Sequence, residues 1–161
     1  MAQTSYSINQ AGGQAGGIAD DGRHDVVSAT NPTAATPFGA AVAYGAVDGD
    51  CKLPSSSTDK ILGVAILEQT KEQALGTGVV NYPAGSLISV LKRGRINVAV
   101  ENAVVAGGPV YVRFAAGAGG ALLGAFRSDA DTGSAVIVDG ALFATSAASG
   151  GIAIVDMNLP A

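Results

Sequence analysis

Residues that could carry out chemistry are few in this chain of 161 residues. His24 is the single histidine, and no G-x-S-x-G elbow presents a nucleophile that would make it the base of a catalytic triad. The single cysteine, Cys51, follows Asp50, whose carboxylate is expected to raise the pKa of the thiol and to disfavour a reactive thiolate. The sequence therefore predicts no catalytic residue, and we expect the protein not to be an enzyme.

Paired aspartates are the remaining candidates for cation binding or acid–base catalysis. They are Asp20 with Asp21, Asp48 with Asp50, and Asp129 with Asp131. None of them belongs to a complete EF-hand loop, which needs Gly at position 6 and Glu at position 12. Aspartate is also a common turn residue. We therefore predict no metal site and no cofactor, and an enzyme that uses these pairs stays a minor alternative.

Lys92, Arg93 and Arg95 form the one basic cluster of the sequence. Such a cluster is usually a solvated hairpin tip, but it could also make a salt-sensitive contact with an acidic protein surface. The formal net charge of the whole chain is -4 at pH 7, which argues against nucleic acid as a partner. No apolar run approaches the length of about 18 residues that a membrane helix needs, so we expect no membrane association.

The elements that must position these residues centre on residues 85–114, where strand-forming residues are densest. Alternation places Ile96, Val98 and Val100 on one face of a strand, and Asn97, Ala99 and Glu101 on the other. The first face is expected to be buried. Gly94 is either the positive-φ residue of a tight hairpin or a bulge that bends one long strand, and the sequence leaves both possibilities open.

Composition indicates an all-β fold. Hydrophobic residues make up 48% of the chain against 14% charged residues, and the 23 glycines suit many tight turns between short strands. We predict a small antiparallel β-barrel or sandwich with short strands. Further strands are expected at 61–67, 109–114, 122–126, 135–138, 141–144 and 152–155. A helix from 59 to 75 is the alternative to the first of these, but Gly63 is unfavourable inside a helix.

Residues 1–37 differ in composition from the rest of the chain. They are poor in large apolar side chains, so they cannot bury a core of their own. We predict an extended N-terminal arm over 1–37, with a short strand at 25–28, and a single β-rich body over 38–161. The arm is either a floppy terminus or a segment that becomes ordered on a neighbouring subunit, and the sequence leaves both open.

An ordered series of motifs resembles the structural cement, or head decoration, proteins of tailed bacteriophages. The motifs are AGGIAD at 15–20, DVVS at 25–28, PFG at 37–39, ILGVA at 61–65, YPAG at 82–85, GRINV at 94–98, GGPVYVR at 107–113, GAF at 124–126, GALFAT at 140–145 and GIAIV at 151–155. The series covers most of the chain. It consists of turn and core positions and contains no reactive constellation.

The resemblance implies a non-enzymatic virion protein that binds the outside of an assembled capsid and ties neighbouring capsomers together. Its implied partners are the major capsid protein and other copies of itself, with a homotrimer favoured and a homodimer possible. Production in the bacterial host cytoplasm is expected, because one cysteine cannot make an internal disulfide. The candidate contact residues are Ile18, Asp25, Val26, Val27, Lys92, Arg93 and Arg95.

A ligand- or carbohydrate-binding β module of a surface or fibre protein is the alternative function. Carbohydrate sites commonly stack sugar rings on exposed aromatic side chains. This chain has four Tyr, four Phe and no Trp. The sequence therefore favours the cement protein over the sugar-binding module.

Overall fold

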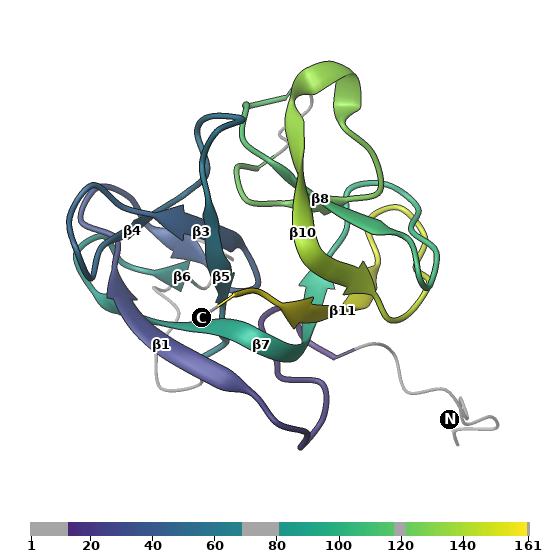
Figure 1. Ribbon diagram of the computed structural model, residues 1–161, viewed down its shortest axis with the longest axis horizontal. Helices are drawn as coiled ribbons and strands as arrows, with labels where there is room; N and C mark the ends of the chain where they lie inside the picture. Colours follow the sequence, from purple (N-terminus) through teal and green to yellow (C-terminus); the bar gives the residue numbers. More distant parts are fainter. Residues whose placement is uncertain (1–12, 69–80, 118–121, 161) are drawn as a thin grey trace, which may run out of the picture.

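A computed structural model describes residues 13–68, 81–117 and 122–160, and almost all of its regular structure is β (Figure 1). The strands are β1 (Asp25–Thr30), β2 (Thr36–Pro37), β3 (Ala41–Tyr44), β4 (Cys51–Lys52), β5 (Ile61–Ala65), β6 (Asn81–Tyr82), β7 (Leu87–Ala99), β8 (Pro109–Arg113), β9 (Phe126–Arg127), β10 (Ala135–Phe143) and β11 (Ile152–Asn158). One 3₁₀ turn, Asp131–Gly133, is the helical element of the described part. No helix within these ranges is long and apolar enough to cross a membrane.

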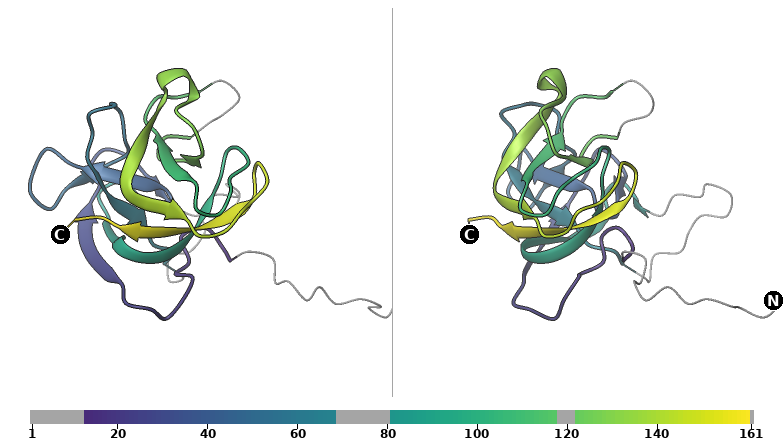
Figure 2. Two further views of the ribbon diagram at one scale, coloured as in Figure 1. Left: turned by 45° about the vertical axis from the view of Figure 1, so that its right-hand side comes forward. Right: turned by 90° about the vertical axis from the view of Figure 1, so that its right-hand side faces the viewer.

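Nine of the strands form one antiparallel sheet. Its order is β4-β3-β5-β7-β11-β10-β8-β9, and β1 is additionally paired with β7. Strands β2 and β6 form a separate two-stranded sheet. The large sheet curls strongly, so that β3 and β5 stand opposite β8 and β10 in a half-barrel (Figures 1 and 2). The predicted all-β, antiparallel fold is confirmed.

Strand β7 is the centre of the sheet, and at 13 residues it is also the longest strand. Arg93 is aligned with Asp25 of β1 and with Asn158 of β11, so β1 and β11 lie on opposite edges of β7. Leu91 is aligned in the same way with Val26 of β1 and with Val64 of β5. The N-terminal segment therefore covers one edge of β7, while β5 and β11 follow each other along the other edge.

A one-residue bulge, and not a hairpin, lies near Gly94. The pairing with β1 passes from Leu91 directly to Arg93, which leaves Lys92 without a partner residue in β1. Leu91 and Ile96 are an odd number of residues apart, yet both side chains belong to the same core. An extra residue in one strand reverses the alternation of its side chains, which explains this arrangement. The bulge therefore decides which residues of β7 face the inside of the curl.

Two hydrophobic cores lie on the two faces of the sheet. The larger core fills the curl and includes Ile96, Val98 and Val100, as predicted. The second core includes Ile88 and Val90 of β7, together with Ala29, Val42, Cys51, Leu62, Ala65 and Tyr82. Phe38 packs edge-on against Tyr82 with ring centroids 5.0 Å apart. Since Val90 and Leu91 face different cores, both faces of the first part of this strand are covered.

Some predicted strand boundaries are wrong. Residues 122–125 form a turn in place of the predicted strand, and β9 begins only at Phe126. Gly124 adopts φ +80°, which is unfavourable for other residues in a strand. The two strands predicted at 135–138 and 141–144 are one strand, β10, with a register shift between Ile137 and Leu142. The strand predicted at 61–67 is β5, while most of the alternative helix at 59–75 falls outside the described residues or on β5.

The N-terminal region contributes strands to the fold. The strand predicted at 25–28 is confirmed and extends to Thr30 as β1. Thr36 and Pro37 pair with Tyr82 and Asn81 in the small sheet. The division into an arm at 1–37 and a body at 38–161 stays a prediction, and residues 1–12 lie outside the described ranges.

Candidate interaction surface

Residues 16–30 run along the edge of β7 opposite β11, and they bring most of the predicted contact residues together. The N–H of Gly16 donates to the carbonyl of Asn97 at 2.7 Å, and the N–H of Ala19 donates to the carbonyl of Arg95 at 2.9 Å. We call this edge of the sheet, with the side chains on both of its faces, the β1–β7 surface. It comprises Ile18, Asp20, Arg23, Asp25 and Val26 from the N-terminal segment, Arg93 and Arg95 from β7, and Asp156 from β11.

A tight turn at residues 20–24 connects the two parts of this edge segment. The Asp20 carboxylate accepts a hydrogen bond from the N–H of Gly22 at 3.0 Å, and Nδ1 of His24 lies 2.9 Å from the carbonyl oxygen of Gly22. His24 crosses close to Gly94, where a Cβ added to the glycine would lie 2.8 Å from Cβ of His24. The single histidine thus supports the turn, and Gly94 leaves room for it.

Charges on the β1–β7 surface are balanced. Arg95 lies between two carboxylates, with Nε 3.2 Å from Asp156 and Nη1 3.7 Å from Asp20. Nε of Arg93 lies 3.9 Å from Asp25 and donates to the carbonyl of Leu159 at 3.2 Å. Arg93 and Arg95 of the basic cluster are therefore neutralised locally by aspartates from the N-terminal segment and from β11. Exposed ion pairs of this kind contribute little to stability.

A shallow hollow and two apolar side chains complete the surface. The hollow has a volume of about 420 Å³ and is lined by the side chains of Asp20, Arg23, Arg93, Arg95 and Asp156 among others. Ile18 and Val26 are 39% and 44% exposed. They are aligned with Ile96 and Leu91, which face the larger core, so they lie on the other face of this edge from Arg93 and Arg95. The edge can offer a partner protein apolar contact area on one face and charged groups on the other.

Five of the seven predicted contact residues share the β1–β7 surface, and two do not. Val27 packs against the second core. The side chain of Lys92 reaches Tyr44 of β3, and its Nζ lies 3.4 Å from the hydroxyl of Tyr44. The bulge separates Lys92 from Arg93, although they are neighbours in the sequence.

A second charged cluster was not predicted from the sequence. Arg113 of β8 and Arg127 of β9 are 3% and 8% exposed. Both guanidinium groups bind the carboxylate of Glu101, with Nε of Arg113 2.7 Å and Nη1 of Arg127 2.9 Å from its oxygens. They also bind Asp131, and Arg127 binds Asp129 at 2.7 Å. The sequence contained one signal for this cluster, because Arg113 and Arg127 each end a short apolar strand.

This cluster holds the 3₁₀ turn in place. The hydrogen bond with Glu101 is the main cause that raises the pKa of Arg113, and the hydrogen bond from Arg127 holds the pKa of Asp129 below its usual value. Asp131 and Thr132 adopt positive φ angles of 44° and 53°. Such backbone angles persist when surrounding contacts impose them. The paired aspartates at 129 and 131 are therefore partners of arginines, which accounts for them without a cation.

Cys51 and Asp50, the other residues considered for chemistry, lie in surroundings that serve the fold. Burial, with a smaller effect of the Asp50 carboxylate, raises the pKa of the Cys51 thiol to about 11, which confirms that a thiolate is disfavoured. The N–H of Asp50 donates to the carbonyl of Val47 at 3.0 Å within a turn. Among the described residues, no three His, Cys, Asp or Glu side chains gather as a metal site would require.

The fold and the β1–β7 surface define a class of protein: a β-rich structural or binding protein in which the arginines of β7, β8 and β9 have carboxylate neighbours. The family model of the structural cement proteins, described by E217 gp24 and Pam3 gp6, matches residues 2–158. The chain therefore belongs to the phage structural cement protein family. This membership confirms the resemblance seen in the sequence, gives the chain a capsid-stabilising structural role and implies that it is not an enzyme.

A solved structure has the same fold. The chain is similar to a chain of the capsid of Myoviridae phage XM1, with a TM-score of 0.70 and 21% sequence identity. The similarity covers 98% of this chain and 97% of that chain. No curated protein matches the sequence.

Proposed function

We propose that this protein binds the outer surface of an assembled phage capsid and links neighbouring copies of the major capsid protein. The family match over residues 2–158 is the observation that carries this proposal. Binding only the assembled shell favours that shell by mass action. The protein would be made in the cytoplasm of the bacterial host and would remain on the outside of the virion.

The β1–β7 surface is the part of the molecule that we propose contacts the capsid. Ile18 and Val26 offer exposed apolar area, and their backbone is fixed along β7 before binding. Apolar anchors surrounded by polar residues carry most of the energy of typical protein interfaces. Because Arg93 and Arg95 already have carboxylate neighbours, we expect raised salt to weaken binding only modestly.

Self-association would strengthen the attachment. Capsids present symmetry axes, and a homotrimer placed on a threefold axis would contact several capsid subunits at once. We favour the homotrimer, and a homodimer on a twofold axis is the other possibility. The comparisons do not support the alternative of a carbohydrate-binding module.

Cosedimentation with capsids that lack this protein tests the proposal. We expect saturable binding at a fixed ratio to the major capsid protein. Ile18→Glu and Val26→Glu should each weaken binding about tenfold or more, because each places a charge in the proposed contact. Val105→Glu is the matched control, because Val105 is 69% exposed in a loop outside the β1–β7 surface.

The possible outcomes test the cement function and the location of the capsid contact separately. No binding of the unaltered protein to such capsids would overturn the cement role on that shell. If the unaltered protein binds and the Ile18 and Val26 variants bind equally well, the assignment of the contact to the β1–β7 surface is overturned.

A further inference from the structure

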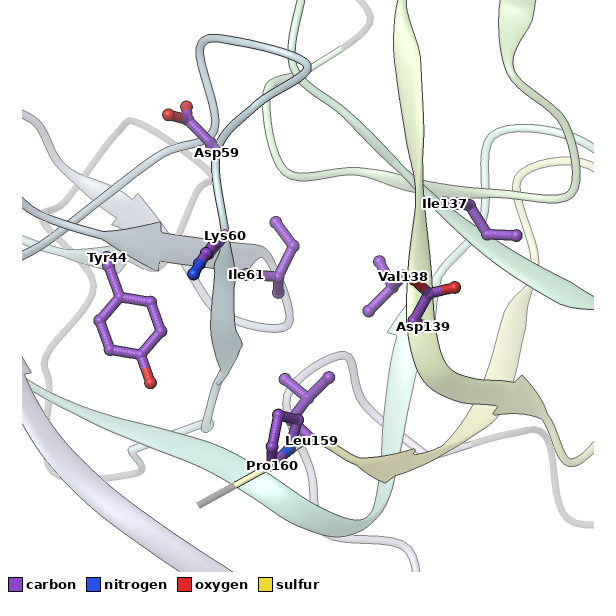
Figure 3. A pocket seen from close by; sticks show the side chains of 9 residues that line it. All are labelled: Tyr44, Asp59, Lys60, Ile61, Ile137, Val138, Asp139, Leu159 and Pro160. Carbon is purple, nitrogen blue, oxygen red and sulfur yellow. The ribbon is translucent and has the colours of Figure 1, made fainter.

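An open groove lies where the half-barrel fails to close. It has a volume of about 610 Å³, and residues from the end of β3, the start of β5, the middle of β10 and the end of the chain line it. Figure 3 shows Lys60 and Ile61 on one side of the groove, Val138 and Asp139 on the other, and Leu159 between them. The groove is distinct from the β1–β7 surface.

Two strand edges beside the groove lack a partner in the described part of the chain. Strand β10 pairs with β8 on one edge from Ala135, but it pairs with β11 on the other edge only from Ala141 onward. Strand β5 pairs with β3 from Ile61, but it pairs with β7 only at Val64 and Ala65. Unpaired edges of this kind are ready to accept a further strand.

The walls of the groove combine apolar side chains with the charged residues Asp59, Lys60 and Asp139. Val138 and Leu159 form its buried part and belong to the larger core. Tyr44 and Ile137 are 48% and 47% exposed at its margin. Such area is costly to leave in water and favours an occupant that has apolar side chains on one face.

Residues 4–9, TSYSIN, have the sequence of a strand that suits this groove. Tyr6 and Ile8 alternate with Ser5, Ser7 and Asn9, so one face of an extended segment would be apolar and the other polar. Residues 1–12 contain no charged side chain, so the segment brings no unpaired side-chain charge into the groove. At about 3.3 Å per residue, twelve extended residues reach about 40 Å.

The position of Gly13 favours the groove of another molecule. Gly13 lies beside the side chain of Asn97, where an added Cβ would be 2.6 Å from Nδ2. The segment that follows it is bonded through Gly16 to Asn97 of β7 and to Leu67 just after β5, whereas Leu159 in the groove is bonded to Lys92, five residues before Asn97 along β7. Five residues of a strand span about 16 Å, which exceeds the about 10 Å that a three-residue link such as 10–12 provides.

We propose that residues 4–9 of a second copy of this chain lie in the groove as an extended strand that pairs with β10. Tyr6 and Ile8 would then cover the apolar wall, and the added strand would fill the gap between β10 and β5. Each copy would donate its segment to a neighbour, which is a head-to-tail contact that closes when the copies form a ring. This contact would exist without a capsid.

Chemical cross-linking of the full-length protein in solution tests the proposal. In a Cys51→Ala background, Ile8→Cys is combined with Tyr44→Cys in the groove, and a short bismaleimide is added. The control combines Ile8→Cys with Val105→Cys, which is 69% exposed and outside the groove. We expect links between chains, at multiples of the monomer mass, to form at least tenfold more in the groove pair than in the control.

Each other outcome would overturn a defined part of the proposal. Links confined to single chains, at a rate independent of protein concentration, would show that the segment occupies its own groove. Equal linking of the two pairs would show that the segment does not lie in the groove. Because no capsid is present, failure here would leave the proposed cement function standing, and success would not establish it.

Discussion

At the scale of single residues, the least expected feature is the pair of buried arginines. Arg113 and Arg127 share Glu101, and Asp131 closes the cluster from the 3₁₀ turn. Charged side chains this deeply buried are tolerated because each finds an opposite charge. The cluster therefore couples β8 and β9 to the turn at residues 129–133. The exposed pairs of Arg95 are the natural comparison within the same molecule.

Loss of one buried arginine should cost far more stability than loss of an exposed one. Arg113→Leu leaves the Glu101 and Asp131 carboxylates with Arg127 alone, and we expect a loss of about 3 kcal/mol in the free energy of unfolding. Arg95→Leu removes exposed pairs and should cost less than about 1 kcal/mol. Urea unfolding of both variants checks this prediction. Equal losses would show that the buried cluster is not a special contribution to stability.

The turn should also make stability depend on pH. The pKa of Asp129 is lowered by the hydrogen bond from Arg127, whereas an Asp in the unfolded chain titrates near about 3.9. The stabilisation by this carboxylate is therefore fully present above about pH 4 and is lost as the pH falls through the folded-state pKa.

Comparison of Asp129→Asn with the unaltered protein tests this dependence. We expect the variant to be less stable at pH 7 and the difference to be smaller at pH 2, measured by urea unfolding at each pH. Asp21→Asn, at an exposed position, is the control. A difference that is the same at both pH values would contradict the role of the Asp129 carboxylate.

At the scale of elements, the bulge in β7 organises the sheet. Before Lys92, the residue that faces the larger core is Leu91, and after it the residues are Ile96 and Val98. The bulge is also the point at which β5 gives way to β11 along one edge of β7. Local twist and bending increase at a bulge. We therefore expect the bulge to contribute to the curl of the sheet beside the open groove.

Deletion of Lys92 should abolish the native packing. Without the extra residue, Ile96 and Val98 would point away from the core that they fill, because side chains alternate along a strand. We expect no cooperative unfolding transition, measured by circular dichroism during heating. Lys92→Ala keeps the bulge and is the control, which should unfold cooperatively. A cooperative deletion variant would show that β7 can shift its register.

At the scale of the whole molecule, the half-barrel offers two separate faces. The β1–β7 surface lies along the N-terminal edge segment, and the groove lies on the side of β7 that carries β5 and β11. A cement protein needs contacts both to the shell and, if it assembles, to copies of itself. Contacts of both kinds on one rigid body raise the avidity of every copy on a symmetric shell. The two proposals can thus hold together, although each can fail alone.

The sequence alone determined the all-β class, the buried face of residues 96–100, the turn-rich connections and the family. These features follow from local alternation, from glycine content and from ordered motifs, which need no knowledge of distant contacts. Only the tertiary structure decided that Gly94 lies within one long strand, that Val27 is packed against a core, and that Arg93 and Arg95 are neutralised. The aspartates responsible, Asp20, Asp25 and Asp156, come from two distant parts of the chain. Their meeting depends on strand pairing, and the register of pairing is set by the packing of both cores together.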